Sequence, residues 1–312
     1  MDGVLVIDKP AGPTSHDVVA RVRRVTGIRK IGHTGTLDPS ATGVLPLVFG
    51  RATRLARFLS SREKVYEAEI RFGRTTDTYD AAGQFSTEIP AAGATALDRS
   101  AVEAALKHFR GAFAQTPPPF SAKKVAGVPA YRLARQKSAI ELQPVAMTVH
   151  RLELRRFDPA GPDGGSDAPS ATVEVECSAG FYVRSLAHDL GQRLGCGAWL
   201  AGLRRLRSGE FGIEQAVTLE TVERNGPDAL RWLVPIDCLL GSFPTVILTP
   251  AGNERAVHGG DIGPEHVRRG WGAEVNGSPG AHVRLLDEAN HLVAVAEWKS
   301  AGELLHPVVV VM

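Results

Sequence analysis

Asp38 is the residue of this 312-residue chain whose setting is best suited to chemistry. It lies in a loop that also contains Gly32, Gly35 and Gly43, and it directly precedes Pro39, which favours an extended backbone at Asp38. Such a loop, between a basic helix and an apolar strand, could hold the carboxylate rigidly at a surface cleft. The alternative is an aspartate that only caps a turn, as aspartate often does before proline.

Three further side chains could complete a site around this carboxylate. Tyr182 and Arg184 are two residues apart, and we expect them to share one face at the end of a strand. A guanidinium there could pair with Asp38 and hold its pKa below the ordinary value of about 3.9. Tyr66 lies in another predicted strand. For both tyrosines, half-buried packing in the core is the alternative.

The apolar patterns predict the elements that must position these residues. Residues 14–26 should form a helix with Thr14 or Ser15 as its N-cap, because Val18, Val22 and Val25 form an apolar stripe. Residues 178–195 should begin as a strand and become a helix near Ser185. The other expected elements are strands at 2–8, 44–50, 64–72, 145–157 and 171–177, and an amphipathic helix at 97–110.

The last 70 residues differ in character from the rest. The β-type runs TVILT, HVRLL, LVAVAEW and HPVVVVM alternate with turn residues, a pattern typical of a small β-barrel. We therefore expect a domain at 1–242 and a second at 243–312. Residues 115–136 are rich in proline and then basic, which favours an exposed excursion followed by a short helix, and 158–170 should be a flexible insertion.

Composition excludes several classes of protein. Hydrophobic residues make up 43% and charged residues 22%, the balance of a soluble protein with an ordinary core. The three isolated cysteines argue against a disulfide framework and against a structural zinc site. The sequence contains no apolar run of membrane-spanning length, and its first residues do not resemble a secretory signal. We expect a cytoplasmic protein.

The net charge of +2 conceals an uneven distribution. Residues 1–60 hold nine basic and four acidic side chains, 120–157 hold eight and two, and 184–207 hold five and one. These three segments carry +15 together, so the remaining residues carry −13. This polarity is typical of a phosphate-binding face. A set of solvated basic helix faces is the alternative.

Five ordered motifs resemble those of the TruB family of pseudouridine synthases, which modify uridine 55 of tRNA. The stretch GHTGTLDPSATGVLPLVFGRATR resembles the family's catalytic signature, and LVIDKPAGPTSHD its Lys-Pro motif. KVYEAEIRFGRTTDTYDAAG resembles the tyrosine motif with its acidic loop, and QTPPPFSAKKVAGVPAYRLAR the family's insertion. CSAGFYVRSLAHDLGQRLGCGAWLAGLRRLRSG resembles the arginine motif. Together the motifs cover most of residues 3–220.

The resemblance implies an α+β fold. A mixed, largely antiparallel sheet flanked by helices would carry a cleft across its middle, and a small PUA-like RNA-binding β-barrel would follow it. The implied reaction detaches uracil from its ribose, rotates the base and rejoins it through carbon, with no cofactor and no metal.

The resemblance also assigns residues. Asp38 matches the catalytic aspartate, Arg184 its partner, and Tyr66 the tyrosine that stacks on the target base. The implied substrate-binding residues are Tyr182 and Leu203 in an apolar pocket, Asp80 at the flipped nucleotide, His33 at the gap left by flipping, and Lys123, Lys124, Arg132 and Arg135 at phosphates, within an insertion at 116–145 that clamps the T arm.

Two other functions fit parts of this pattern. The basic segments alone would suit an RNA chaperone that folds tRNA without chemistry, and the site alone would suit an isomerase acting on another RNA. The intact set of Asp38, Tyr66 and Arg184 favours an enzyme, and the insertion favours the T arm of tRNA. We expect a monomer that binds tRNA and no membrane.

Overall fold

The computed structural model describes residues 1–86, 94, 96–121, 124–125, 128–129, 142–159, 168–271, 280–299 and 304–312. Its main sheet contains β1 (Gly3–Lys9), β2 (Ile31–His33), β3 (Thr42–Phe49), β4 (Lys64–Phe72), β5 (Gly111–Gln115), β8 (Val145–Asp158), β9 (Ser170–Cys177), β10 (Ala198–Ser208), β11 (Phe211–Gly212), β12 (Val217–Thr218) and β13 (Val234–Pro235). The helices are α1 (Ser15–Thr26), α2 (Ala56–Ser60), α3 (Arg99–Leu106), α5 (Val183–Arg193), α6 (Leu219–Asn225) and α7 (Pro250–Val257).

The second sheet contains β14 (Thr245–Leu248), β15 (Val267–Arg269), β16 (His282–Leu286), β17 (Leu292–Trp298) and β18 (Leu305–Val310). A separate hairpin pairs β6 (Lys124–Val125) with β7 (Val128–Pro129). The 3-10 helices are η1 (Gly50–Leu55), η3 (Lys107–Phe109), η4 (Ile213–Gln215), η5 (Gly226–Trp232), η6 (Ile236–Cys238) and η7 (Pro264–His266).

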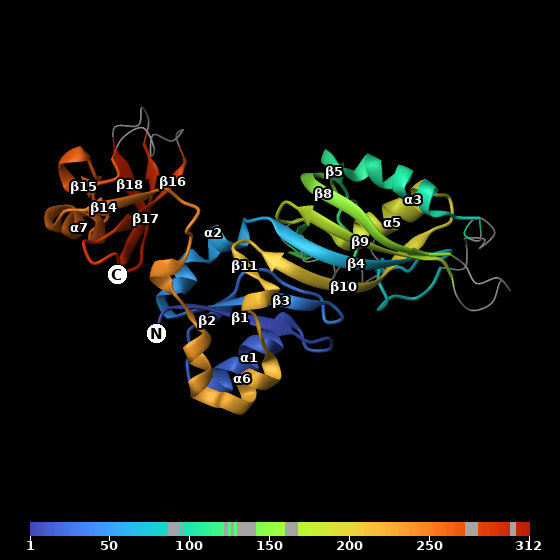
Figure 1. The fold of residues 1–312 in the computed structure, drawn as a ribbon, viewed down its shortest axis with the longest axis horizontal. Coiled ribbons are helices and arrows are strands. Elements are labelled where there is room, and N and C mark those ends of the chain that lie inside the picture. The colour runs from blue at the N-terminus through green and yellow to red at the C-terminus, as the bar shows by residue number, and fades with distance from the viewer. Residues whose placement is uncertain are drawn as a thin grey trace.

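The main sheet runs in the order β12-β1-β3-β10-β4-β9-β8-β5, and Figure 1 shows it as a long curved layer through the molecule. Most of its neighbouring strands are antiparallel, while β1 with β12 and β3 with β10 are parallel. The expected α+β class and mixed, largely antiparallel sheet are therefore confirmed.

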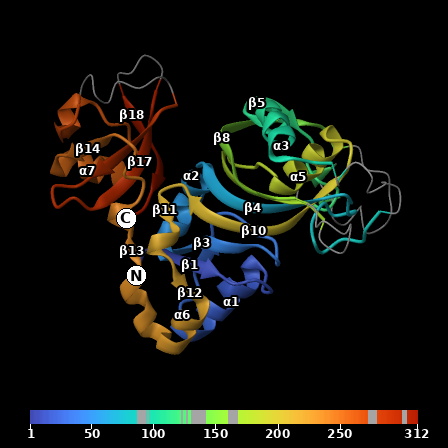
Figure 2. The same cartoon turned by 45° about the vertical axis from the view of Figure 1, so that its right-hand side comes forward.

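The two faces of the main sheet are covered differently. On β1, Leu5 and Ile7 point into the core beneath the helices, whereas Val4 and Val6 belong to a second apolar cluster on the other face. The first core gathers buried side chains of α1, α3, α5 and α6, so these helices cover one face. Figure 2 shows α1 and α6 side by side below β1. The alternation along β1 therefore decides which face each element packs on.

The sheet is weakly joined at its centre. Among the described residues, β3 and β10 pair in parallel only at Thr42 with Arg204 and Gly43 with Arg205. Gly43 has φ +98°, and a Cβ placed on it would lie 2.2 Å from the Arg205 carbonyl oxygen. Because only glycine accepts this backbone and this close approach, Gly43 is required where the two halves of the sheet meet.

The structure confirms the predicted start of α1. Thr14 is its N-cap: the Thr14 hydroxyl accepts from the Asp17 backbone N–H, and the Asp17 carboxylate accepts from the Thr14 backbone N–H. This reciprocal capping box pairs two N–H groups that would otherwise lack partners. The helix ends at Gly27, which has φ +73°. Val18 and Val22 are buried as the stripe predicted, and Val25 packs partly buried against the same core.

One local prediction is wrong. The segment before α5 is not a strand: α5 begins at Val183, Tyr182 is its N-cap, and Arg184 lies in the first helical turn. The apolar-aromatic run Phe181-Tyr182-Val183 resembles a strand in sequence, but it forms the entry to a helix packed on β10. The long strand β10, which joins the two halves of the sheet, was not predicted.

The second sheet has the order β15-β14-β16-β17-β18 within the described residues. The four β-type runs of the tail each form one of its strands. Ile262 and Leu305 exchange two backbone hydrogen bonds, which tie β18 to the segment just before β15. Leu286, Leu292 and Val295 of this sheet belong to the same apolar cluster as Ala52 and Leu55 of η1. Arg54 of η1 donates to the Val310 carbonyl of β18, so the second sheet packs against η1. Among the described helices, none has the length and apolar character of a membrane span.

Candidate active site

A cavity of about 320 Å³ lies beside the paired strands β4 and β10. Its walls are formed by the loop after β2, by the neighbouring antiparallel strands β4 and β10, and by the chain that leads into α5. The lining residues are Gly35, Thr36, Leu37, Asp38, Ser60, Lys64, Tyr66, Gly180, Phe181, Tyr182, Val183, Arg184, Leu203 and Arg205. Asp38, Tyr66, Tyr182, Arg184 and Leu203, all predicted from the sequence, therefore meet in one cavity.

Arg184 and Asp38 form an ion pair in this cavity. The Arg184 Nε atom lies 3.0 Å from an Asp38 carboxylate oxygen. Arg184 also donates from Nη1 to the Phe120 carbonyl at 3.1 Å and lies 3.7 Å from an Asp80 carboxylate oxygen. The Arg184 side chain is 9% exposed and that of Asp38 is 40% exposed. The guanidinium is thus fixed on several sides, while the carboxylate keeps an open side toward the cavity.

The predicted direction of the Asp38 pKa is wrong. Burial in the cleft raises the pKa of Asp38, and the nearby Asp80 carboxylate raises it further, while Arg184 and Lys9 lower it. Desolvation is the largest of these effects, so the pKa lies above its ordinary value despite the ion pair. The sequence could place a cation beside the carboxylate, but it could not weigh that cation against the loss of water.

Lys9 anchors the loop that carries Asp38. Its side chain is fully buried, and its ammonium donates to the carbonyls of Pro10 at 3.0 Å, Pro39 at 3.1 Å and Ala41 at 2.7 Å. Two of these carbonyls lie within three residues of Asp38. Burial lowers the pKa of Lys9, and the Asp38 charge raises it again. Lys9 was not among the predicted site residues, although the LVIDKP motif that contains it could have indicated a role at the site.

Asp80 is held close to the pair by its own loop. One carboxylate oxygen accepts from the Thr78 hydroxyl at 2.6 Å and from the Ala82 backbone N–H at 3.0 Å, and the other faces Arg184. The Asp80 backbone forms a bridge with Leu200 of β10. Asp80 therefore lies beside Arg184, and its contact with the flipped nucleotide stays a prediction.

Tyr66 forms part of the floor of the cavity. It is 9% exposed, and it belongs to the core beneath the helices. Burial raises the pKa of its hydroxyl, while the Arg205 charge lowers it. Arg205 itself is 1% exposed and donates to the carbonyls of Val44 at 2.7 Å and Gly35 at 3.0 Å. The buried Arg205, which the sequence analysis also missed, thus ties β10 to β3 and to the loop that contains Asp38.

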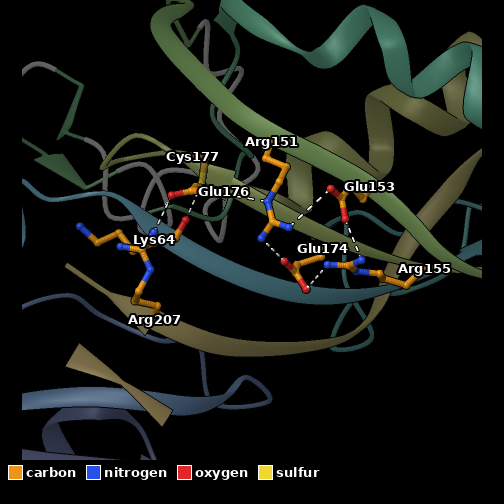
Figure 3. Close-up of polar contacts among 8 residues, drawn as sticks. All are labelled: Lys64, Arg151, Glu153, Arg155, Glu174, Glu176, Cys177 and Arg207. Carbon is orange, nitrogen blue, oxygen red and sulfur yellow. Dashed lines mark hydrogen bonds and ion pairs between the residues drawn. The ribbon is translucent and has the colours of Figure 1, made fainter. Parts of the chain in front are cut away.

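Lys64 is a second buried cation in the lining. Its ammonium donates to the carbonyls of Ser60 and Arg62 at 2.5 and 2.6 Å, and burial lowers its pKa to about 8. Figure 3 shows Lys64 close to Cys177. Burial raises the pKa of the Cys177 thiol to about 12, so at neutral pH the thiol stays protonated and behaves as a core side chain.

His33 lies outside the cavity lining, at the end of β2. Its ring packs edge-on against His16 with ring centroids 5.2 Å apart. Burial lowers the pKa of His33, and the charges of His16 and Arg205 lower it further. Its Nδ1 atom is buried and has no hydrogen-bond partner among the described residues. His33 is therefore a neutral ring at neutral pH.

The predicted phosphate contacts lie largely outside the described residues. Lys123, Arg132 and Arg135 lie outside the described residues, and so does the short helix expected toward the end of residues 115–136. Lys124 is described in its backbone alone, where it pairs with Pro129 in the hairpin of β6 and β7. Most of the insertion predicted at 158–170 is likewise not described.

Comparison with known proteins identifies the family. Residues 23–183 match the N-terminal domain of the TruB family of pseudouridylate synthases, and residues 184–240 match the C-terminal domain of tRNA pseudouridylate synthase B. The first match alone covers more than half of the chain. This chain belongs to the TruB family. Because the border between the two matches falls in the first turn of α5, the residues of the candidate site come from both.

Curated relatives and solved structures extend the comparison. The tRNA pseudouridine synthase B of Solibacter usitatus is 45% identical over 99% of this chain and 100% of that protein. The protein of the same name from Pseudomonas aeruginosa is 40% identical over 97% of this chain and 94% of that protein. A Cbf5-Nop10-Gar1 complex contains a chain of similar fold, with a TM-score of 0.72 and 25% identity over 99% of this chain and 85% of that chain. A chain in an H/ACA ribonucleoprotein bound to substrate RNA has the same TM-score at 24% identity, with the same coverage of both chains.

The open face of the TruB sheet carries a ladder of alternating charges, which Figure 3 shows. Arg151 pairs with Glu174, and Arg155 pairs with both Glu174 and Glu153 at 2.9 and 2.7 Å. Arg207 pairs with Glu176 at 2.5 Å. The sums of charge over sequence segments treat these three arginines as free to bind phosphate, but Glu174 and Glu176, which pair with them, lie on β9 outside the basic segments. The polarity inferred from those sums is therefore overstated on this face.

Proposed function

We propose that this protein is a tRNA pseudouridine-55 synthase, which isomerises uridine 55 in the T loop of tRNA. The observation that carries the proposal is the Arg184–Asp38 ion pair, 3.0 Å between Nε and carboxylate, opening into a cavity with Tyr66 on its wall. Relatives of nearly the same length named tRNA pseudouridine synthase B support the same substrate.

The proposed reaction adds and removes no atoms. The bond from C1′ to N1 of uracil breaks, the base rotates, and a bond from C1′ to C5 forms; the C5 proton is lost and N1 gains one. Asp38 supplies an ionised carboxylate that acts as nucleophile or base. Arg184 aims that carboxylate into the cavity, and the apolar side of the cavity, which includes Leu203, limits the escape of the detached base.

A uridine in a folded loop has to leave the base stack to reach this cavity. The cavity volume of about 320 Å³ falls in the range of sites for small ligands. In our proposal Tyr66 and Tyr182 contact the extruded base, Asp80 binds the nucleotide, and His33 occupies the gap that the base leaves. Its lowered pKa suits that role, because a neutral ring stacks between bases without a charge to solvate.

The remaining parts of the proposal concern the RNA and the assembly. Residues 116–145, with Lys123, Lys124, Arg132 and Arg135, contact phosphates of the T arm. Residues 243–312 form a PUA-like RNA-binding domain after a catalytic domain at 1–242. The protein works as a cytoplasmic monomer, uses no cofactor, and needs no partner protein.

Pseudouridine mapping tests the proposal. Purified protein is incubated with unmodified tRNA and, in parallel, with a ribosomal RNA fragment, and pseudouridine is located by chemical sequencing. We expect modification of uridine 55 alone, and none with Asp38→Asn, which should still bind tRNA. Wild-type protein that leaves uridine 55 unmodified would contradict the assignment, and modification of the ribosomal fragment would identify a different substrate.

A further inference from the structure

Gln115, the last residue of β5, makes two hydrogen bonds to Tyr182, the N-cap residue of α5. Its side-chain nitrogen donates to the Tyr182 carbonyl at 3.0 Å, and its side-chain oxygen accepts from the Tyr182 backbone N–H at 2.8 Å. Gln115 is 2% exposed. A side-chain amide that pairs with both polar groups of one residue fixes that residue's backbone as a strand pair would.

The entry to α5 needs such a partner. Tyr182 is the N-cap of α5, but among the described residues its side chain makes no capping hydrogen bond, and the first turn contains no acidic residue. The first N–H groups of a helix require partners from outside the helix or from water. Gln115 accepts from the N–H of the N-cap residue Tyr182, as Asp17 accepts from the N–H of the N-cap residue Thr14 in α1.

Two residues of the first turn of α5 are held by the same neighbouring segment. The Ser185 hydroxyl donates to the Thr116 carbonyl at 2.7 Å, and Arg184 donates from Nη1 to the Phe120 carbonyl at 3.1 Å. Residues 115–120 therefore fix positions 182, 184 and 185 in turn. The direction in which Arg184 leaves the helix depends on these contacts.

We propose that Gln115 is a positioning residue, which sets Arg184 against Asp38 through the backbone of Tyr182. Gln115 does not line the cavity and does not touch Asp38. If its amide is lost, the Tyr182 N–H loses the Gln115 acceptor and the Tyr182 carbonyl is left with the Leu186 N–H, so the first turn of α5 shifts or frays. A displacement of the guanidinium by about 1 Å is enough to lower a catalytic rate by up to about a hundredfold. The inference rests on the proposed function for its kinetic test alone.

Three variants separate positioning from folding. Gln115→Leu removes both hydrogen bonds, and Gln115→Glu keeps an acceptor while removing the donor as long as the introduced carboxyl is ionised. Gln192→Glu makes the same chemical change on the exposed side of α5 and is the matched control. Single-turnover rates on uridine 55, tRNA affinity and the folded fraction at the assay temperature are measured for each.

We expect both Gln115 variants to lose at least about tenfold in single-turnover rate, with tRNA affinity within threefold of wild type and the protein folded. The loss in Gln115→Glu should shrink relative to wild type as pH falls, because the protonated carboxyl donates again. Rates within twofold of wild type, or losses that follow the unfolded fraction, would overturn the proposal.

A second readout does not depend on turnover. The Arg184 Nε–H resonance, identified by its absence in Arg184→Lys, reports the hydrogen bond to Asp38. We expect this resonance to shift toward that of a free arginine in Gln115→Leu and to stay in place in Gln192→Glu. An unchanged resonance in Gln115→Leu overturns the positioning role. Failure of wild-type protein to modify uridine 55 would count against the proposed function instead.

Discussion

The Arg184 Nε atom lies 3.0 Å from the Asp38 carboxylate, yet the pKa of Asp38 is raised above its ordinary value. The ion pair does not compensate for the water that the cleft removes, and the Asp80 carboxylate adds repulsion. The charged form of Asp38 therefore lowers the stability of the folded protein. Catalytic carboxylates are often held in such unfavourable surroundings.

The first prediction concerns pH and Asp38→Asn. A raised folded pKa means that the folded state binds more protons than the unfolded state, so stability is lost as pH rises from the unfolded value near 3.8 through the folded pKa. We expect the thermal unfolding midpoint of Asp38→Asn, measured relative to that of wild type, to increase as the pH rises from 4 to 7. Thermal unfolding followed by circular dichroism measures the difference. A difference that shrinks with rising pH would show that Arg184 outweighs desolvation.

The second prediction concerns the anchor of the catalytic loop. Lys9→Met removes the buried donor of the Ala41 carbonyl, while the Pro39 carbonyl still accepts from the Gly12 N–H. We expect a loss of about 2 kcal/mol or more in unfolding free energy, because an unpaired buried polar group costs about 1–3 kcal/mol. Urea denaturation measures the loss. Lys30→Met changes an exposed lysine and should stay within about 0.5 kcal/mol of wild type; equal effects of the two changes would refute the anchoring role.

The third prediction concerns the join between the halves of the sheet. Gly43→Ala places a Cβ 2.2 Å from the Arg205 carbonyl and forces alanine to a φ near +98°. We expect a loss of about 3 kcal/mol or more, from backbone strain and overpacking together. Gly241→Ala is the control, since a Cβ there meets no atom within 4 Å. Denaturant midpoints compare the two, and a stable Gly43→Ala protein would mean that β3 and β10 can separate freely.

The fourth prediction separates free from paired basic residues. Under the proposed function, Lys123→Ala combined with Lys124→Ala should weaken the salt dependence of tRNA binding. The slope of log affinity against log salt concentration should become less steep by about 1.5. Arg151→Ala combined with Arg155→Ala should leave the slope nearly unchanged, because both guanidiniums are bound to Glu174. Filter binding across a salt series measures both slopes. If the arginine pair lowers the slope and the lysine pair does not, the RNA lies on the open face of the sheet.

The sequence by itself determined much of the local structure. The period of the valines and the Thr14–Asp17 pair define α1, because a capping box acts within four residues. Alternation of apolar residues defines β4 and β9, because each side chain of a strand faces opposite to its neighbour, and a continuous apolar run defines β1. The motif order identified Asp38, Tyr66 and Arg184, and these three side chains do line one cavity.

The tertiary structure alone decided what depends on contacts between distant segments. The helix that carries Arg184 begins at Val183 because its entry packs on β10 and pairs with Gln115, and neither contact can be read from a run such as Phe181-Tyr182. The positive charge that the sheet face of Arg151 and Arg155 can offer to phosphate depends on which carboxylates form ion pairs with these two arginines. The pKa of Asp38 depends on how much water the folded cleft excludes. Desolvation and pairing are properties of the assembled fold, and no spacing along the chain contains them.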